Sequence, residues 1–425
     1  MRSGVLLSMA LAVKTVRIPR RVLLGVSLGI VVAGLLLRPG LVEYRTWQAR
    51  RALARHDART ALARLELAES LSPESGATQF WMARAHRRLG QMGRAHERLA
   101  RASRLGYSAQ ALALEELLAL VQTGRMSLSD PRLLARMMDP GDDASELYEA
   151  AVQGSLRSFR LDDARSLLDA WEGDQADSPQ PHMYRGLVLS HQGAWPEAAD
   201  SFGRALALAP WRNDVRLHLA RALRESRDYR RALGLYRQYL VGEADDPDAL
   251  FGLGMCLDSM GKSREARETY VRVLTLKPDH DEARLAIGKL DSTHGRAAEA
   301  IAWLEPAVAR SPHEQDLRLA YAWALQIVGR PAREHFEFAA RAQAASATVK
   351  HLVRRVVDNP RDVELRYAIG AMLLQYGRPQ EGVAWLESVL QIQPDHQRAR
   401  DALAAHEAGR AVPKRDAPAP QRTAH

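Results

Sequence analysis

Small and apolar residues recur along most of the chain at a fixed interval of 34 residues. The residues that keep this interval are Ala61 and Ala95; Ala164, Ala198, Ala232, Ala266 and Ala300; Gly254 and Gly288; Gly261 and Gly295; and Pro278 and Pro312. A period of this length is typical of repeats in which each unit is one pair of helices. Because the chain is also rich in Ala, Leu, Arg and Glu and poor in β-branched runs, the pattern predicts an all-α protein.

Each position of the repeat has a physical role. Gly or Ala at position 8 and Ala at position 20 allow two antiparallel helices to approach closely, and a larger apolar residue near position 24 fills the space beside them. Gly at position 15 ends the first helix in a left-handed cap, and a terminal Pro stops the second helix. No unit can bury its apolar face alone, so we expect the units to stack.

This pattern resembles the tetratricopeptide repeat family. One unit supplies Leu250, Leu253, Gly254, Leu257, Ala266, Tyr270 and Pro278, and another supplies Gly186, Gly193, Ala198, Phe202, Ala205 and Pro210. The resemblance implies a right-handed α-solenoid of about ten helix pairs that binds protein or peptide partners in its concave groove. It implies no catalytic residues, no cofactor and no metal.

The phase of the repeat predicts the domain organisation. The array covers residues 42–396, and its units begin near residues 42, 76, 110, 145, 179, 213, 247, 281, 315 and 363. The third unit is degenerate because it carries Pro131 and lacks the second-helix alanine. About 14 extra residues near 345–360 predict a lengthened or additional helix, residues 397–410 a capping helix, and residues 411–425 a disordered tail.

The N-terminal part of the chain has the pattern of a membrane anchor. A basic segment, residues 1–21, precedes an apolar run in residues 22–42 that is long enough for one transmembrane helix. A cleaved signal peptide is the alternative, but no A-x-A-like cleavage site follows the run. The basic residues before the run favour a cytoplasmic N-terminus, and the arginines after it, Arg38, Arg45, Arg50 and Arg51, oppose that orientation.

Charge and cysteine content exclude several classes of function. The net charge is +9, but basic residues are not interleaved with exposed aromatics, so we expect no nucleic-acid binding. The single cysteine, Cys256, excludes an internal disulfide and a paired-cysteine zinc site, and burial is its expected state. The segment 254–263 ends in GKS but has six residues between its glycines, two more than a phosphate-binding loop allows.

The resemblance also implies which residues line the groove, at positions 5 and 9 of each first helix. We expect Phe80, Phe251, Met255, Trp323 and Tyr367 to be partly exposed, and Arg84, Arg221 and Lys289 to pair with acidic groups of a partner. Met183 completes the protein-binding set. The alternative is that some of these side chains pack between adjacent units.

The acidic stretch KPDHDEAR, residues 277–284, sits where one unit meets the next. We interpret Asp279 and Asp281 as helix caps and expect His280 to be a surface residue of the turn, with no metal site.

Together these observations predict a non-enzymatic scaffold in a bacterial inner membrane, with a periplasmic array that serves envelope assembly and possible homo-oligomerisation. The alternatives are a cytoplasm-facing adaptor that regulates a membrane-associated enzyme, and an enzyme with a site in the groove. The Ala- and Arg-rich composition favours the bacterial source.

Overall fold

The computed structural model describes residues 38–408, and every regular element in that range is helical. The prediction of an all-α protein is therefore confirmed for the described residues. The basic segment 1–21, nearly all of the anchor 22–42 and the tail 411–425 lie outside the described range. Among residues 38–408, no helix is both long enough and apolar enough to span a bilayer.

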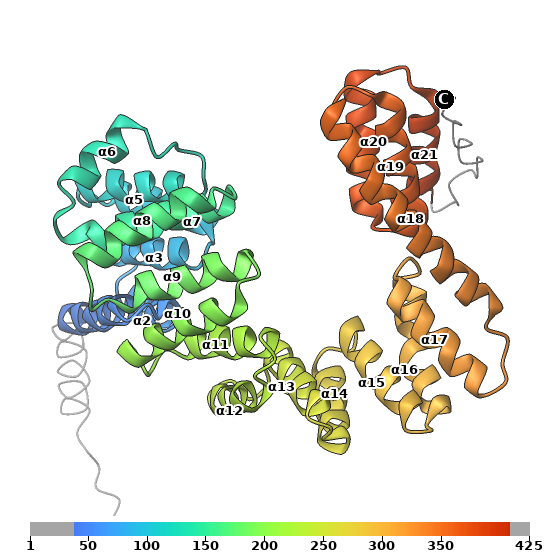
Figure 1. Ribbon diagram of the computed structural model, residues 1–425. Coiled ribbons are helices and arrows are strands. Elements are labelled where there is room, and N and C mark those ends of the chain that lie inside the picture. The colour runs from blue at the N-terminus through green and yellow to red at the C-terminus, as the bar shows by residue number, and fades with distance from the viewer. Residues whose placement is uncertain (1–37, 409–425) are drawn as a thin grey trace, which may run out of the picture. The chain divides into compact units, whose positions relative to one another are not determined.

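The chain forms two compact units, residues 1–184 and 185–425, and we describe each by itself. The described part of the first unit begins with a helix over residues 38–54. The helices that follow (Figure 1, blue to green) are α2 (Ala58–Leu71), α3 (Gly76–Arg88), α4 (Met92–Arg104), α5 (Ala109–Gln122), α6 (Pro131–Met138), the 3-10 turn η1 (Gly141–Asp143), α7 (Ala144–Arg157) and α8 (Leu161–Asp174). The unit boundary falls within α9 (Pro179–His191).

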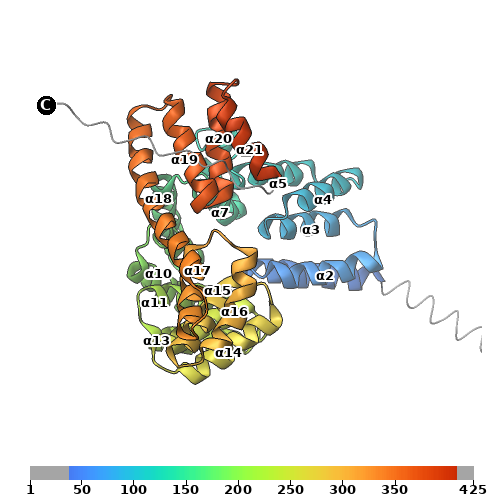
Figure 2. The same cartoon turned by 90° about the vertical axis from the view of Figure 1, so that its right-hand side faces the viewer.

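The second unit continues as a succession of antiparallel helix pairs. Its helices are α10 (Trp195–Leu208), α11 (Asn213–Glu225), α12 (Tyr229–Leu240), α13 (Pro247–Ser259), α14 (Ser263–Leu276), α15 (Asp281–Thr293), α16 (Ala297–Arg310), α17 (Gln315–Ile327), α18 (Arg333–Asp358), α19 (Val363–Tyr376), α20 (Pro379–Ile392) and α21 (Gln397–Glu407). The extra residues near 345–360 belong to α18, a single helix of 26 residues that packs against both α17 and α19 (Figure 2).

The two helices of a pair approach closely at glycine, as the repeat pattern predicts. A Cβ atom added to Gly254 would lie 2.5 Å from the ring of Tyr270, and one added to Gly186 would lie 2.6 Å from the ring of Phe202. The same relation holds between Gly288 and Leu304. These are positions 8 and 24 of their units, so the missing side chain on one helix makes room for the large side chain on the other.

Position 15 adopts the left-handed conformation in the turn between the helices of a pair. Gly261 has φ of 73°, which glycine reaches without steric cost. His56, Phe159 and Arg227 take the same conformation in the corresponding turns, with φ of 59°, 53° and 66°. For a residue with a Cβ atom this conformation costs about 1–2 kcal/mol, so those three turns are strained relative to the glycine turns.

The interpretation of the KPDHDEAR stretch was wrong in two respects, the exposure of His280 and the identity of the helix cap. His280 is buried, and its Nδ1 accepts a hydrogen bond of 3.3 Å from the backbone N–H of Ala283, so the histidine itself caps α15. Asp281 instead accepts hydrogen bonds from Arg310 and from Ser311, the latter at 2.9 Å. His396 caps α21 in the same way, through a 3.1 Å bond from the N–H of Ala399.

The close contact between Gly254 and Tyr270 predicts different effects for two glycine substitutions. Gly254→Ala should destabilise the second unit by about 1–3 kcal/mol, because the buried ring of Tyr270 must move to accept the methyl group. Gly203→Ala in α10 is the matched control. A Cβ atom there meets nothing within 4 Å, so the change should stabilise by about 0.5–1 kcal/mol through helix propensity.

Urea unfolding of both variants, followed by circular dichroism, measures these effects. Equal shifts of the two unfolding midpoints would contradict the close contact at Gly254.

Candidate functional site

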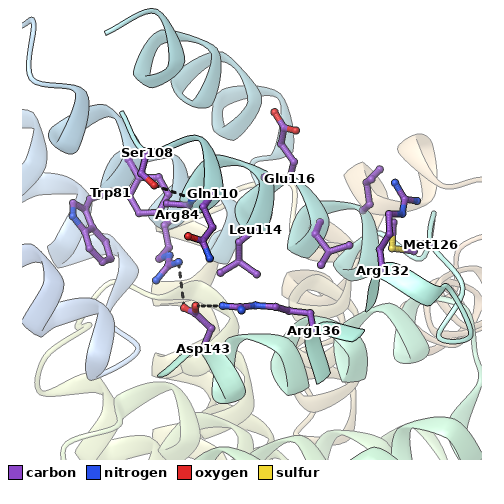
Figure 3. A pocket seen from close by; sticks show the side chains of 15 residues that line it. Trp81, Arg84, Ser108, Gln110, Leu114, Glu116, Met126, Arg132, Arg136 and Asp143 are labelled. Atoms are coloured by element: carbon purple, nitrogen blue, oxygen red, sulfur yellow. Dashed lines mark hydrogen bonds and ion pairs between the residues drawn. The ribbon is translucent and has the colours of Figure 1, made fainter. Parts of the chain in front are cut away.

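The first unit contains a hollow of about 680 Å³ beside the degenerate third repeat. It exists because α6 has only 8 residues and leaves part of α5 uncovered. Side chains from α3, α5, α6 and the intervening turns line it: Phe80, Trp81, Arg84, Ser108, Gln110, Ala111, Ala113, Leu114, Glu116, Leu117, Leu120, Met126, Arg132, Arg136 and Asp143 (Figure 3). The hollow lies wholly within the first unit.

One wall of the hollow combines aromatic rings with a guanidinium group. The Cζ atom of Arg84 lies 5.2 Å from the ring centroid of Phe80 and 5.1 Å from that of Trp81. Phe80 also stacks on Tyr107 with centroids 4.6 Å apart, which fixes the orientation of its ring. Leu117 and Leu120 of α5 add apolar side chains to the lining. The hollow therefore offers apolar contact and a cation together, as anchor pockets of protein interfaces do.

The charged side of the hollow is arranged around Asp143. Its carboxylate lies 3.0 Å from Arg136 and 3.8 Å from Arg84, so it joins α6 to α3 (Figure 3). Arg132 is paired with Asp130 at 3.0 Å and is mostly exposed. Arg84 and Arg136 share the carboxylate of Asp143, and Arg84 also pairs with Glu115 of α5. The half-buried Arg136 is therefore the cation best placed to meet an acidic group of a ligand.

Beneath the hollow, Arg87 holds three helices together. The fully buried guanidinium of Arg87 on α3 donates to Glu115 of α5 at 2.7 Å, to Gln122 of α5 at 2.9 Å and to Glu146 of α7 at 2.5 Å. Arg88 adds a second ion pair to Glu146. Each of the three guanidinium nitrogens of Arg87 has an acceptor, and such pairing is the condition for burying a charge in a protein interior.

Burial and neighbouring charge act in opposite directions on this cluster. Burial alone would raise the pKa of Glu146, but the guanidinium groups of Arg88 and Arg87 hold the pKa of that carboxyl well below its usual range. Burial and the adjacent Glu149 carboxylate raise the pKa of Tyr184, whose hydroxyl donates to Glu149 at 2.8 Å. Glu146 therefore stays ionised at neutral pH, and its ion pairs with Arg87 and Arg88 join α7 to α3.

Comparison with known families identifies the repeats. Two tetratricopeptide repeat family models match the chain, one over residues 155–211 and the other over residues 223–290. These ranges cover α8 to α10 and α12 to α15 almost completely, and both contain the glycine contacts described above. Residues 155–211 and 223–290 therefore carry tetratricopeptide repeats.

Solved structures show similarity over part of the chain. MamA residues 41 to the end from Desulfovibrio magneticus RS-1 is 21% identical, and the match covers 40% of this chain and 95% of that one with a TM-score of 0.38. Another crystal structure of MamA is 19% identical and matches 38% of this chain and 94% of that one, with a TM-score of 0.36. A search of curated proteins finds no match. The tetratricopeptide repeats make the chain a protein-interaction scaffold.

The structure corrects two of the predicted groove residues. Phe80 is only 2% exposed because Tyr107, Trp81 and Arg84 surround its ring, so it was wrong to expect a partly exposed side chain. Met183 is 7% exposed and belongs to the packed interior. Of the predicted set, the hollow brings together Phe80 and Arg84 alone.

The remaining predicted residues lie in the second unit. Trp323 is 53% exposed on α17 and meets Phe336 edge to face, with centroids 5.0 Å apart. Phe251 and Tyr367 are half-buried and lie beside the capping histidines His280 and His396, at 4.8 Å and 5.3 Å. Arg221, Met255 and Lys289 are half-buried or exposed. None of these six lines the hollow.

Sequence reasoning missed the residues of α5 and α6 that build the hollow. Leu117, Leu120 and Arg136 lie in the third repeat, which lacks its second-helix alanine and carries Pro131. Pro131 begins the short α6. The degeneracy of this repeat was visible in the sequence and was the signal that could have located the hollow.

Among residues 38–408 there is neither a metal-binding cluster nor an activated thiol. Within residues 38–408, no three His, Cys, Asp or Glu side chains are placed to hold a metal ion. Cys256 is fully buried, as predicted, and burial raises the pKa of its thiol to about 11. A thiol with so high a pKa is a poor nucleophile at neutral pH.

The charge cluster makes a prediction about acid stability. Because the pKa of Glu146 is lower in the folded state, its ion pairs stabilise the first unit fully above the unfolded value of about 4.3. This stability is lost as the pH falls below that value, at about 1.4 kcal/mol per pH unit for one proton. The Glu146→Gln variant should not show this pH-dependent loss of stability, although it should be less stable than the wild type at neutral pH.

Hydrogen exchange of the α3 and α7 amides between pH 5 and pH 3, corrected for intrinsic exchange rates, measures how steeply the free energy of unfolding changes with pH. Glu337→Gln, which removes an exposed ion pair with Arg333, is the control and should leave it unchanged. An unaltered slope in Glu146→Gln would exclude this carboxyl as the group that titrates.

Proposed function

We propose that the protein is a non-enzymatic scaffold held in a bacterial inner membrane by residues 22–42, and that it binds a segment of a partner protein in the hollow of the first unit. The repeats support the scaffold role, and the apolar run after a basic segment supports the anchor. The hollow is the observation that carries the binding site, because it places leucines and an aromatic wall beside shared arginines.

The lining of the hollow specifies the chemistry of the bound segment. Apolar side chains of the segment would contact Leu117, Leu120 and Trp81, and an acidic side chain would pair with Arg84 or Arg136. A short amphipathic segment that carries one or two carboxylates satisfies both requirements. Envelope assembly is the process we propose for such a partner, since the positive residues before the anchor favour a periplasmic array.

Site-specific photo-crosslinking tests the binding site. A benzophenone amino acid at Gln110 or Glu116, both exposed on the edge of the hollow, should form an adduct with one defined partner in intact cells. The same group at Arg59 on α2, exposed but outside the lining, is the control. Arg136→Glu should reduce the adduct about tenfold or more, because it reverses the charge that faces the ligand.

Circular dichroism would show that the Arg136→Glu variant keeps its fold. An adduct that forms equally at Arg59, or one that survives Arg136→Glu in a folded chain, would contradict binding in the hollow.

A second candidate orientation is favoured by the arginines that follow the apolar run. Arg38, Arg45, Arg50 and Arg51 would be retained on the cytoplasmic side by the positive-inside rule, which would make the protein a cytoplasm-facing adaptor of a membrane-associated enzyme.

Alkaline phosphatase fused after residue 410 decides between the orientations, because this enzyme is active only in the periplasm. We expect an active fusion. A fusion that is expressed but inactive, with an active green fluorescent protein fusion at the same site, would establish the cytoplasmic orientation.

A further inference from the structure

The helix over residues 38–54 carries an exposed stripe that its packing within the first unit does not explain. Leu41 is 44% exposed, and Tyr44 and Trp47 are each 51% exposed. Their spacing of three residues places them on one face of the helix. Ala49 and Leu53, on the opposite face, are buried against α2 and α3. The helix is therefore fixed to the unit by one side and presents aromatic rings on the other.

Arginines extend the same stripe. The exposed Arg51 and Arg55 follow Trp47 at helical spacing, and the Cζ atom of Arg51 lies 5.5 Å from the ring centroid of Trp47. Tyr44 stacks on Trp47 with centroids 6.0 Å apart. Between residues 38 and 55 the chain has five arginines and one acidic residue, Glu43. Arg51 and Arg55 therefore add positive charge to the aromatic stripe, whereas Arg50 contacts Trp81 of α3.

We infer that this stripe rests on the headgroup layer of an anionic membrane, an interaction that depends on the proposed anchoring by the apolar run of residues 22–37. Trp and Tyr concentrate at membrane interfaces because their rings are apolar and their N–H or O–H groups remain hydrated. Arginine near the surface attracts anionic lipid and can extend its head toward the phosphates. A protein partner would need a matching excess of acidic side chains, whereas an anionic bilayer carries negatively charged headgroups over its whole surface.

The position of the stripe in the sequence brings it to the membrane. The apolar run 22–37 ends four residues before Leu41, a distance of about 6 Å along a helix, comparable to the thickness of a headgroup layer. An upright helix would carry Trp47 about 15 Å beyond the run and out of that layer. Pro39 and Gly40 disfavour a straight continuation, and this allows helix 38–54 to lie along the surface.

Spin labels on the full-length chain test the inference. A Cys256→Ala background would carry one added cysteine, Tyr44→Cys or Trp47→Cys, and the labelled protein would be reconstituted into vesicles of phosphatidylcholine with or without phosphatidylglycerol. Trp211→Cys is the matched control, because Trp211 is also an exposed tryptophan, 62% accessible, but lies in the second unit. Collision with oxygen relative to a water-soluble nickel chelate reports membrane contact.

In vesicles that contain phosphatidylglycerol, the oxygen-to-nickel ratio at positions 44 and 47 should exceed that at position 211 by about threefold or more, as expected for an interfacial site. Replacing Arg45, Arg51 and Arg55 together with glutamine should remove most of this difference. If the chain floats with the vesicles but the oxygen-to-nickel ratios at positions 44 and 47 equal the ratio at position 211, the inferred lipid contact is wrong. The proposed anchor would not be affected by that result.

Three other outcomes would also count against the inference. Equal ratios in neutral and anionic vesicles would overturn the role of anionic lipid. Protection of the labels from both reagents would show that protein, such as a second copy of this chain, covers the stripe. A chain that floats with neither type of vesicle would overturn the proposed anchor together with the lipid contact.

Discussion

The close contact between a glycine on the first helix of a pair and a large side chain on the second is the constraint on which the array depends. Gly254 and Tyr270, and Gly186 and Phe202, leave no space for an added Cβ atom. This contact sets the separation of the two helices, so the remaining surface of each first helix is presented in a regular way from unit to unit. Surface chemistry can then vary without changing the scaffold.

The third repeat departs from this rule, and the departure creates the candidate site. The short α6 leaves α5 in direct contact with α7, and Arg87 joins α3, α5 and α7 through Glu115 and Glu146. These ion pairs tie α3 to α5 and α7, and an apolar cluster that includes Leu118, Leu133 and Leu147 packs α5, α6 and α7 together. Both sets of contacts hold the helices that line the hollow in fixed positions.

The period predicted the helix pairs because it reflects backbone packing, which repeats in every unit. The site was predicted poorly because it depends on contacts that occur once. Phe80 is buried by Tyr107 from the turn after α4, and His280 replaces an aspartate as the cap of α15. Neither contact follows from a repeat position. Arg84 lines the hollow, but its partners Glu115 and Asp143 come from a repeat that departs from the pattern.

Trp81 connects the two surfaces that we assign to ligands. The guanidinium of Arg50 on helix 38–54 lies 4.9 Å from its ring centroid, and that of Arg84 lies 5.1 Å from it. Allosteric coupling would require two arrangements of this cluster that each ligand binds differently. The described contacts form one packed arrangement, in which Ala49 and Leu53 fix the helix against α3. The cluster therefore favours fixed positioning, in which the proposed membrane contact of helix 38–54 would set where the hollow meets its proposed partner.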